Sequence, residues 1–136
     1  MDMQIFDRAT ETVTIPPASK GTLDLMTVSP AVNARISRAD VLSAELSYSV
    51  ATFKTGRFFI NVLAQSTTPD RMQMVNDADV ELLTSAGRVR ISVPMGSIVD
   101  NPSVAKPIRL KFSLQQRIGE LGASIAVATT DVIAYR

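Results

Sequence analysis

The sequence predicts one β-rich domain of the α+β class, in which the strands come first and C-terminal helices follow. Apolar and polar residues alternate over several stretches, and turn residues separate these stretches, which is typical of strands. Helices are indicated by five apolar residues at spacings of three and four: Leu110, Leu114, Ile118, Leu121 and Ile125. The alternative is an all-β sandwich, because part of the same segment also alternates with period two. A chain of 136 residues has the size of a single domain.

The first predicted elements lie before residue 30. Residues 3–6 and 11–15 are rich in β-forming side chains, and the pair Pro16-Pro17 then interrupts the pattern. Residues 22–28 alternate again, until Ser29-Pro30 ends the stretch. We therefore expect a strand, a turn and a second strand.

The next prediction is a hairpin that joins residues 42–50 to residues 57–64. Gly56 lies in the turn between them and can adopt the positive φ that a tight hairpin needs. The predicted core face comprises Leu46, Tyr48, Val50, Phe58, Ile60 and Val62. The predicted outer face comprises Glu45, Ser47, Ser49, Arg57, Phe59 and Asn61.

A further strand is predicted over residues 84–93. Its inward side chains are Val89, Ile91 and Val93, and its outward side chains are Arg88, Arg90 and Ser92. Pro94 ends the strand, because proline cannot donate to a central ladder.

The segment 108–125 fits two patterns. Residues 108–115 alternate as a strand does, whereas the stripe from Leu110 to Ile125 fits a helix. Pro107 is awkward for a helix that starts much upstream, and Gly119 and Gly122 weaken a helix or mark a turn. The local pattern alone leaves both alternatives open.

The composition favours a protein that is not an enzyme. The chain has no Cys and no His, so it lacks a thiol nucleophile, a disulfide framework and the commonest general base and metal ligand. The acids Asp77, Asp79 and Glu81 form the one local acidic cluster, which we interpret as a solvated edge and not as a metal site. No apolar run is long enough to span a bilayer, and no signal peptide is recognisable, so we expect a soluble protein without a cofactor.

Several short stretches resemble the coat proteins of the single-stranded RNA bacteriophages, the leviviruses. Residues 43–50 followed by residues 55–62 are similar to the central hairpin of that family, and residues 88–93 are similar to its next long strand. Residues 75–77 resemble its polar loop, and residues 131–135 resemble its aromatic-tipped tail. The resemblance covers most of the chain as an order of parts and contains no invariant motif.

The resemblance implies an N-terminal hairpin, a five-stranded antiparallel sheet and two C-terminal helices that reach over the sheet of a partner. It therefore favours the helix in the ambiguous segment, from residue 103 or 107 to about residue 121. It also implies an intertwined dimer that builds an icosahedral shell and packages single-stranded viral RNA, and it suggests repression of replicase translation through an RNA hairpin. Such a protein belongs to a virion assembled in the cytoplasm of a bacterial host.

Seven residues are the candidate RNA-binding site of this hypothesis. The arginines would contact phosphates, Phe59 would stack on a base, and the others would donate hydrogen bonds. The candidates are Ser47, Ser49, Arg57, Phe59, Asn61, Arg88 and Arg90. We expect Arg57, Arg88 and Arg90 to project from one sheet face. The second hypothesis is a β-sandwich structural or interaction module, such as a pilus, tail or capsid decoration subunit, whose arginines lie at the rim of a protein interface.

Overall fold

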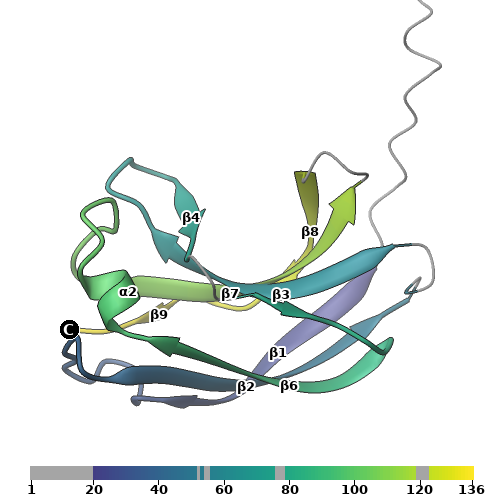
Figure 1. Cartoon of the computed structure of the whole chain (residues 1–136), viewed down its shortest axis with the longest axis horizontal. Coiled ribbons are helices and arrows are strands. Elements are labelled where there is room, and N and C mark those ends of the chain that lie inside the picture. Colours follow the sequence, from purple (N-terminus) through teal and green to yellow (C-terminus); the bar gives the residue numbers. More distant parts are fainter. Residues whose placement is uncertain (1–19, 52, 54–55, 76–78, 119–122) are drawn as a thin grey trace, which may run out of the picture.

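Two antiparallel β-sheets stack face to face in the computed structural model (Figure 1). The structure describes residues 20–51, 53, 56–75, 79–118 and 123–136. Strands account for 58% and helices for 5% of the described residues, which contain no helix of seven residues or more. The fold is therefore mostly β, and no described helix is long and apolar enough to cross a membrane.

Sheet A has three strands, in the order β1 (Gly21–Ser29), β2 (Val41–Val50) and β6 (Ala86–Pro94). Sheet B is centred on β3 (Arg57–Gln65) and β7 (Arg109–Ile118), which pair with each other. The short strands β4 (Met72–Met74) and β5 (Val80–Glu81) pair with the other edge of β3. On the far side, β8 (Ala123–Thr129) and β9 (Ile133–Ala134) pair with β7.

The chain changes sheet three times. It runs from the β1–β2 pair to β3 in sheet B, returns to β6 beside β2, and crosses again to β7 beside β3. This connectivity is the Greek-key arrangement of immunoglobulin-like sandwiches. A one-turn helix, α2 (Gly96–Val99), lies between β6 and β7 and buries Ile98.

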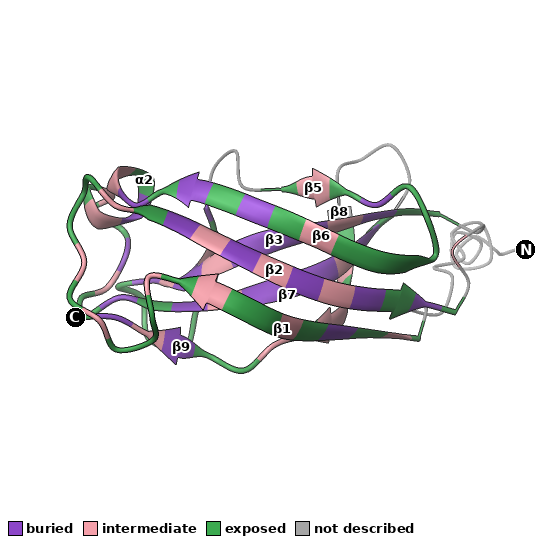
Figure 2. Ribbon diagram, turned by 90° about the horizontal axis from the view of Figure 1, so that it is seen from below, coloured by how far each residue is buried: buried purple, intermediate pink, exposed green. Residues whose placement is uncertain are grey.

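The core lies between the two sheets, as the alternation of buried and exposed positions along the strands shows (Figure 2). All six residues of the predicted core face on β2 and β3 are buried. On β6, Ile91 and Val93 are buried, Val89 is half-buried, and Arg88 and Arg90 are exposed. The predicted strands over residues 22–28, 42–50, 57–64 and 84–93 are thus confirmed, with shifts of one or two residues at their ends.

The prediction of C-terminal helices, and with it the α+β class, is wrong. Residues 103–107 contain no helix, and β7 begins at Arg109 and continues to Ile118. The period-two pattern prevailed because β7 is a central strand: Leu110, Phe112 and Leu114 are all 0% exposed against sheet A. A helix would have buried Leu110 and Leu114 but turned Phe112 away from the core. The all-β sandwich, which was the alternative, describes this chain.

The predicted hairpin of residues 42–50 and 57–64 is also wrong as a pairing. Both strands exist, but β2 belongs to sheet A and β3 belongs to sheet B. Gly56 therefore has another role: a Cβ there would come within 2.8 Å of the Gln116 side-chain amide. The single five-stranded sheet is replaced by two sheets that cover each other. The predicted strands at residues 3–6 and 11–15 lie outside the described residues.

Candidate interaction faces

The seven predicted site residues lie on two opposite faces of the sandwich. Ser47, Ser49, Arg88 and Arg90 belong to strands of sheet A, whereas Arg57, Phe59 and Asn61 belong to β3 of sheet B. The expectation that Arg57, Arg88 and Arg90 share one face is therefore wrong. It failed because β2 and β3 were taken as neighbours in one sheet, while the chain crosses to the other sheet between them.

The outer face of sheet A carries hydroxyl groups and balanced charges. Ser47 lies between Asp24 on β1 and Arg88 on β6, and Glu45 lies directly opposite Arg90. The Ser49 hydroxyl is 2.8 Å from the hydroxyl of Thr22, and either oxygen can donate. Arg90 thus faces a carboxylate directly, and Arg88 has one across Ser47, so the two positive charges are matched by two negative ones. This face has no surplus of positive charge to attract a polyanion.

The outer face of sheet B places Phe59 between two arginines. The Arg117 guanidinium carbon lies 4.6 Å from the ring centroid of Phe59, and that of Arg57 lies 5.4 Å from it. Arg57 and Arg117 are direct cross-strand partners, so the two like charges need compensation. Glu81 on β5 provides it, because Arg57 donates to its two carboxylate oxygens at 3.0 and 2.9 Å.

The Arg57–Glu81 pair shifts the pKa of both side chains. The hydrogen bond from Arg57 lowers the pKa of the Glu81 carboxyl, and the same bond raises the pKa of Arg57. The side chains are 59% and 40% exposed, so water screens the pair and its contribution to stability is small. The pair holds Arg57 in place, and Arg57 in turn lies over the Phe59 ring.

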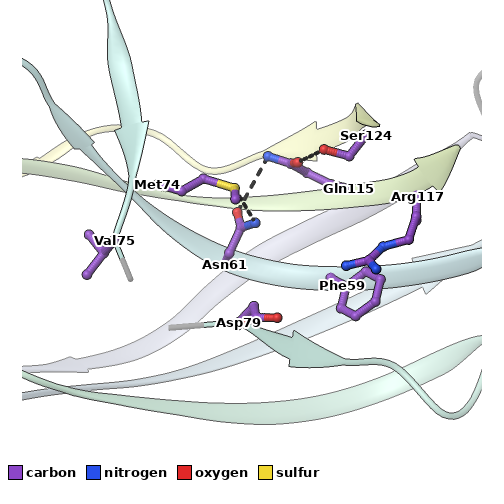
Figure 3. A pocket seen from close by; sticks show the side chains of 8 residues that line it. All are labelled: Phe59, Asn61, Met74, Val75, Asp79, Gln115, Arg117 and Ser124. Atoms are coloured by element: carbon purple, nitrogen blue, oxygen red, sulfur yellow. Dashed lines mark hydrogen bonds between the residues drawn. The ribbon is translucent and has the colours of Figure 1, made fainter. Parts of the chain in front are cut away.

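A chain of polar side chains runs across the same face, beside Phe59 (Figure 3). The Ser124 hydroxyl donates to Gln115 Oε1 at 2.5 Å. Gln115 Nε2 donates to the Ser113 hydroxyl at 3.1 Å and, more weakly, to Asn61 Oδ1 at 3.5 Å. Asn61 Nδ2 in turn lies 3.2 Å from the Met74 sulfur. Asn61 is 5% exposed and Ser113 is 0% exposed, although both belong to the outer face.

A small pocket opens next to this polar chain. Its volume is about 150 Å³, and its walls come from β3, β4, β7 and β8, with Val75 and Asp79 between β4 and β5. Figure 3 shows its eight lining side chains, of which Asp79 is the one carboxylate. Sites for cofactors and drug-sized ligands occupy about 300–1,000 Å³, so this pocket has the size for one side chain of a partner. Figure 1 shows β4 and β8 rising on either side of the sheet B surface.

The sequence prediction missed Glu81 on β5, Ser124 on β8 and the outward residues of β7. The outward row of β7 comprises Arg109, Lys111, Ser113, Gln115 and Arg117, which alternate with the core residues. They were missed because this segment was expected to be helical, and a helix would have scattered them around its circumference. The period-two pattern of residues 108–115 was the signal that identifies them.

No family model and no curated protein matches the chain. The levivirus resemblance therefore stays a prediction from short stretches of sequence, and the interaction faces have to be interpreted from their own chemistry. Among the described residues, no three His, Cys, Asp or Glu side chains gather at a place where they could hold a metal ion.

Proposed function

We propose that this protein is a non-enzymatic structural subunit that assembles with copies of itself by pairing strand edges. The observation that carries the proposal is the free edge of β6. This strand has nine residues and pairs with β2 on one side, and no strand of the described residues pairs with its other side. Its row of backbone donors and acceptors is a template for another strand.

The β6 edge has few of the features that protect an edge strand: it carries the outward charges Arg88 and Arg90, but it is long and has no inward-pointing charge. Edge strands are otherwise kept from pairing by shortness, by inward-pointing charges, by lysine or by proline. β6 contains no lysine, its one proline is the final residue Pro94, and its inward side chains are Val89, Ile91 and Val93. The opposite edge of sheet A differs, because β1 lies beside β8. A long edge with an apolar inner row favours pairing between subunits.

The remaining chemistry agrees with a structural role. The chain has neither His nor Cys, and on the two outer faces Glu45 lies opposite Arg90 and Glu81 pairs with Arg57. The pocket beside Phe59 fits the anchor side chain of a protein partner better than it fits a substrate. Pilus, tail and capsid decoration subunits belong to this class of structural β-sandwich.

The proposal is tested by sedimentation velocity over a concentration series. The wild-type chain should sediment as dimers or larger species at micromolar concentration. Val89→Lys puts an inward-pointing charge on the edge and should yield monomers with an unchanged fold by circular dichroism. Val41→Lys is the matched control, because Val41 is 53% exposed on β2 and does not belong to the edge. A monomeric wild type at all concentrations would contradict self-assembly.

A second candidate function is binding of single-stranded RNA by the outer face of sheet B. The observation that favours it is the charge on this face: the cations Arg57, Arg109, Lys111 and Arg117 outnumber the carboxylates Asp79 and Glu81. A basic surface with an aromatic ring is typical of single-strand binding. Together with self-assembly, RNA binding would make the protein a coat subunit of a virion formed in bacterial cytoplasm, as the sequence resemblance implies.

Fluorescence anisotropy with a labelled single-stranded RNA tests this second function. The triple variant Arg109→Ala, Lys111→Ala, Arg117→Ala should weaken binding and reduce the slope of log K against log salt by about 0.7 for each phosphate that is no longer neutralised. The double variant Arg88→Ala, Arg90→Ala is the control. In the wild type the charges of these two arginines are balanced by Asp24 and Glu45, so their removal should leave the salt dependence at the wild-type slope. Equal losses in both variants would count against a site on sheet B.

A further inference from the structure

We infer that β6 of one copy pairs with β6 of a second copy, antiparallel around a two-fold axis at Ile91, so that the two copies of sheet A join into one continuous sheet. This inference rests on the proposed self-assembly and names the strand that fills the free edge. Three features of the described residues carry it: the direction of the β6 backbone groups, the part of the edge that is open, and the side chains that the pairing brings together.

The free edge of β6 presents the backbone groups of its even-numbered residues. At one end of the β2–β6 ladder the Val50 N–H donates to the Ser85 carbonyl at 2.7 Å, and at the other end the Met95 N–H donates to the Asp40 carbonyl at 2.8 Å. The register between these two bonds has no shift, so the odd-numbered residues of β6 face β2. The even-numbered residues therefore direct their N–H and C=O groups to the free edge.

The part of this edge that is open to a partner runs from Arg88 to Pro94. The Ala86 carbonyl already accepts a hydrogen bond from the Thr84 hydroxyl at 3.0 Å. At the other end Pro94 has no N–H to donate, and a proline is tolerated where that position faces the edge of a sheet. Ile91 lies at the centre of the open stretch, so an antiparallel partner that covers all of it has its two-fold axis there.

An axis at Ile91 also gives matching side chains on both faces. Ile91 then lies opposite the partner's Ile91, and Val89 lies opposite the partner's Val93, so the inner row is apolar across the junction. On the outer face Arg90 lies opposite the partner's Ser92. These two residues exchange both of their edge-facing backbone hydrogen bonds, once on each side of the axis.

Other registers fit less well. An axis between two residues would place the inner side chains of one copy opposite the outer side chains of the other. An axis at Arg90 puts two guanidinium groups directly opposite each other, and an axis at Val89 puts Arg88 opposite the partner's Arg90. An axis at Ser92 leaves the edge groups of Arg88 beyond the end of the partner strand. The charges and the length of the open edge thus select the same register.

This pairing predicts a closed dimer. A two-fold contact uses the free edge of both copies, whereas a head-to-tail contact would continue into a fibre or ring. The opposite edge of sheet A is β1, which lies beside β8 of its own chain. Edge pairing alone therefore ends at two copies, and a larger shell needs a second contact elsewhere on the subunit.

Disulfide trapping determines the register, and the absence of native cysteines makes it specific. A chain carrying Arg90→Cys is mixed with a chain carrying Ser92→Cys and oxidised. The inference predicts that the mixture forms a covalent dimer in higher yield than either variant alone. Ser29→Cys is the matched control, because Ser29 is an exposed serine on β1, at the other edge of the same sheet, and should stay uncoupled. The highest yield from one variant alone, or no covalent dimer from the mixture, overturns the inference.

A charge placed at Ser92 tests the same contact independently. Ser92→Arg puts a like charge opposite the partner's Arg90 at two symmetric places and should weaken dimerisation by about tenfold, whereas Ser92→Glu should strengthen it. The same two substitutions at Ser29 should leave the dimerisation constant within about twofold, because this serine is exposed and far from the contact. Sedimentation equilibrium measures all four variants. Effects of the same sign from the two Ser92 variants, or equal effects at the two positions, overturn the inference.

The wild type separates this inference from the proposed self-assembly. If it associates while the Ser92 variants behave as the Ser29 variants do, the β6 pairing is wrong and self-assembly stands. A wild type that stays monomeric contradicts both. If the amides of Arg88, Arg90 and Ser92 are protected from hydrogen exchange in such a monomer, a segment of its own chain covers the edge.

Discussion

The two outer faces of the sandwich differ, although the two inner faces are alike. The inner faces of sheets A and B are both apolar and fully buried at their centres, with Leu46 and Leu114 each at 0% exposure. The outer face of sheet A carries hydroxyl groups and balanced charges in cross-strand pairs. The outer face of sheet B has a surplus of cations, buried polar groups and a pocket.

This difference suggests separate roles for the two sheets. Sheet A contributes its free β6 edge, and its balanced outer face needs no ligand. Sheet B has both edges of its central pair β3 and β7 occupied by further strands, so it offers a face and not an edge. Under the proposed self-assembly, subunits therefore join through sheet A, and a side chain or polyanion of a partner contacts sheet B.

The largest expected effect tests the similarity of the inner faces. Leu46→Ala on β2 and Leu114→Ala on β7 should each lower the free energy of unfolding by about 2–5 kcal/mol, because each leaves a cavity in the same core. Urea denaturation monitored by circular dichroism measures the change. If one of the two variants costs less than about 1 kcal/mol, the sheets do not share one close-packed core.

A smaller effect should separate the two outer faces. Asn61→Ala on sheet B removes a side chain that is 5% exposed and takes a hydrogen-bond acceptor away from the Gln115 amide, which should cost about 1–3 kcal/mol. Ser47→Ala on sheet A changes a half-buried hydroxyl and should stay within about 0.5 kcal/mol of the wild type. The midpoints of urea denaturation give both values when the dependence of stability on urea concentration is the same in the variants and the wild type. Equal costs would mean that the polar chain on sheet B is not a fixed network.

The smallest effect concerns the pH dependence of the Arg57–Glu81 pair. Because Arg57 lowers the pKa of Glu81 in the folded state, the pair stabilises the protein above the carboxyl's ordinary pKa of 4.5, and this stabilisation is lost as the pH falls through the lowered value. Glu81→Gln and Arg57→Gln should both reduce the loss of stability between pH 7 and pH 3. Urea midpoints at the two pH values measure it. If both variants lose as much stability between pH 7 and pH 3 as the wild type does, the pair does not form.

The sequence predicted the strands well and their partners poorly. Alternation identified the core residues of β2, β3 and β6 because a period of two depends on local sequence alone. It could not tell whether Leu46 and Phe58 lie in one sheet or face each other across two, since both arrangements bury them equally. Pairing is set by contacts between residues far apart in the chain, as between Ser47 and Arg88.

The candidate site was predicted in fragments for the same reason. Arg57, Phe59 and Asn61 were assigned to the outward side of their strand, and the structure places them there. Their neighbours Gln115 and Arg117 were assigned to a helix, because the leucine stripe from Leu110 onward also has helical spacing. Buried polar side chains such as Ser113 have no sequence signature that separates them from exposed ones.

Hydrogen exchange of the β6 backbone amides tests the central claim most directly. The assembled wild type and the Val89→Lys variant are compared by amide exchange resolved to single residues. An added strand bonds every second amide along the free edge, so assembly through this edge predicts that alternate amides of β6 exchange more slowly in the assembled protein. The amides of β2 should exchange alike in both, because β2 is paired on both sides within the chain. Assembled protein whose β6 amides exchange as fast as those of the monomer would contradict assembly through this edge.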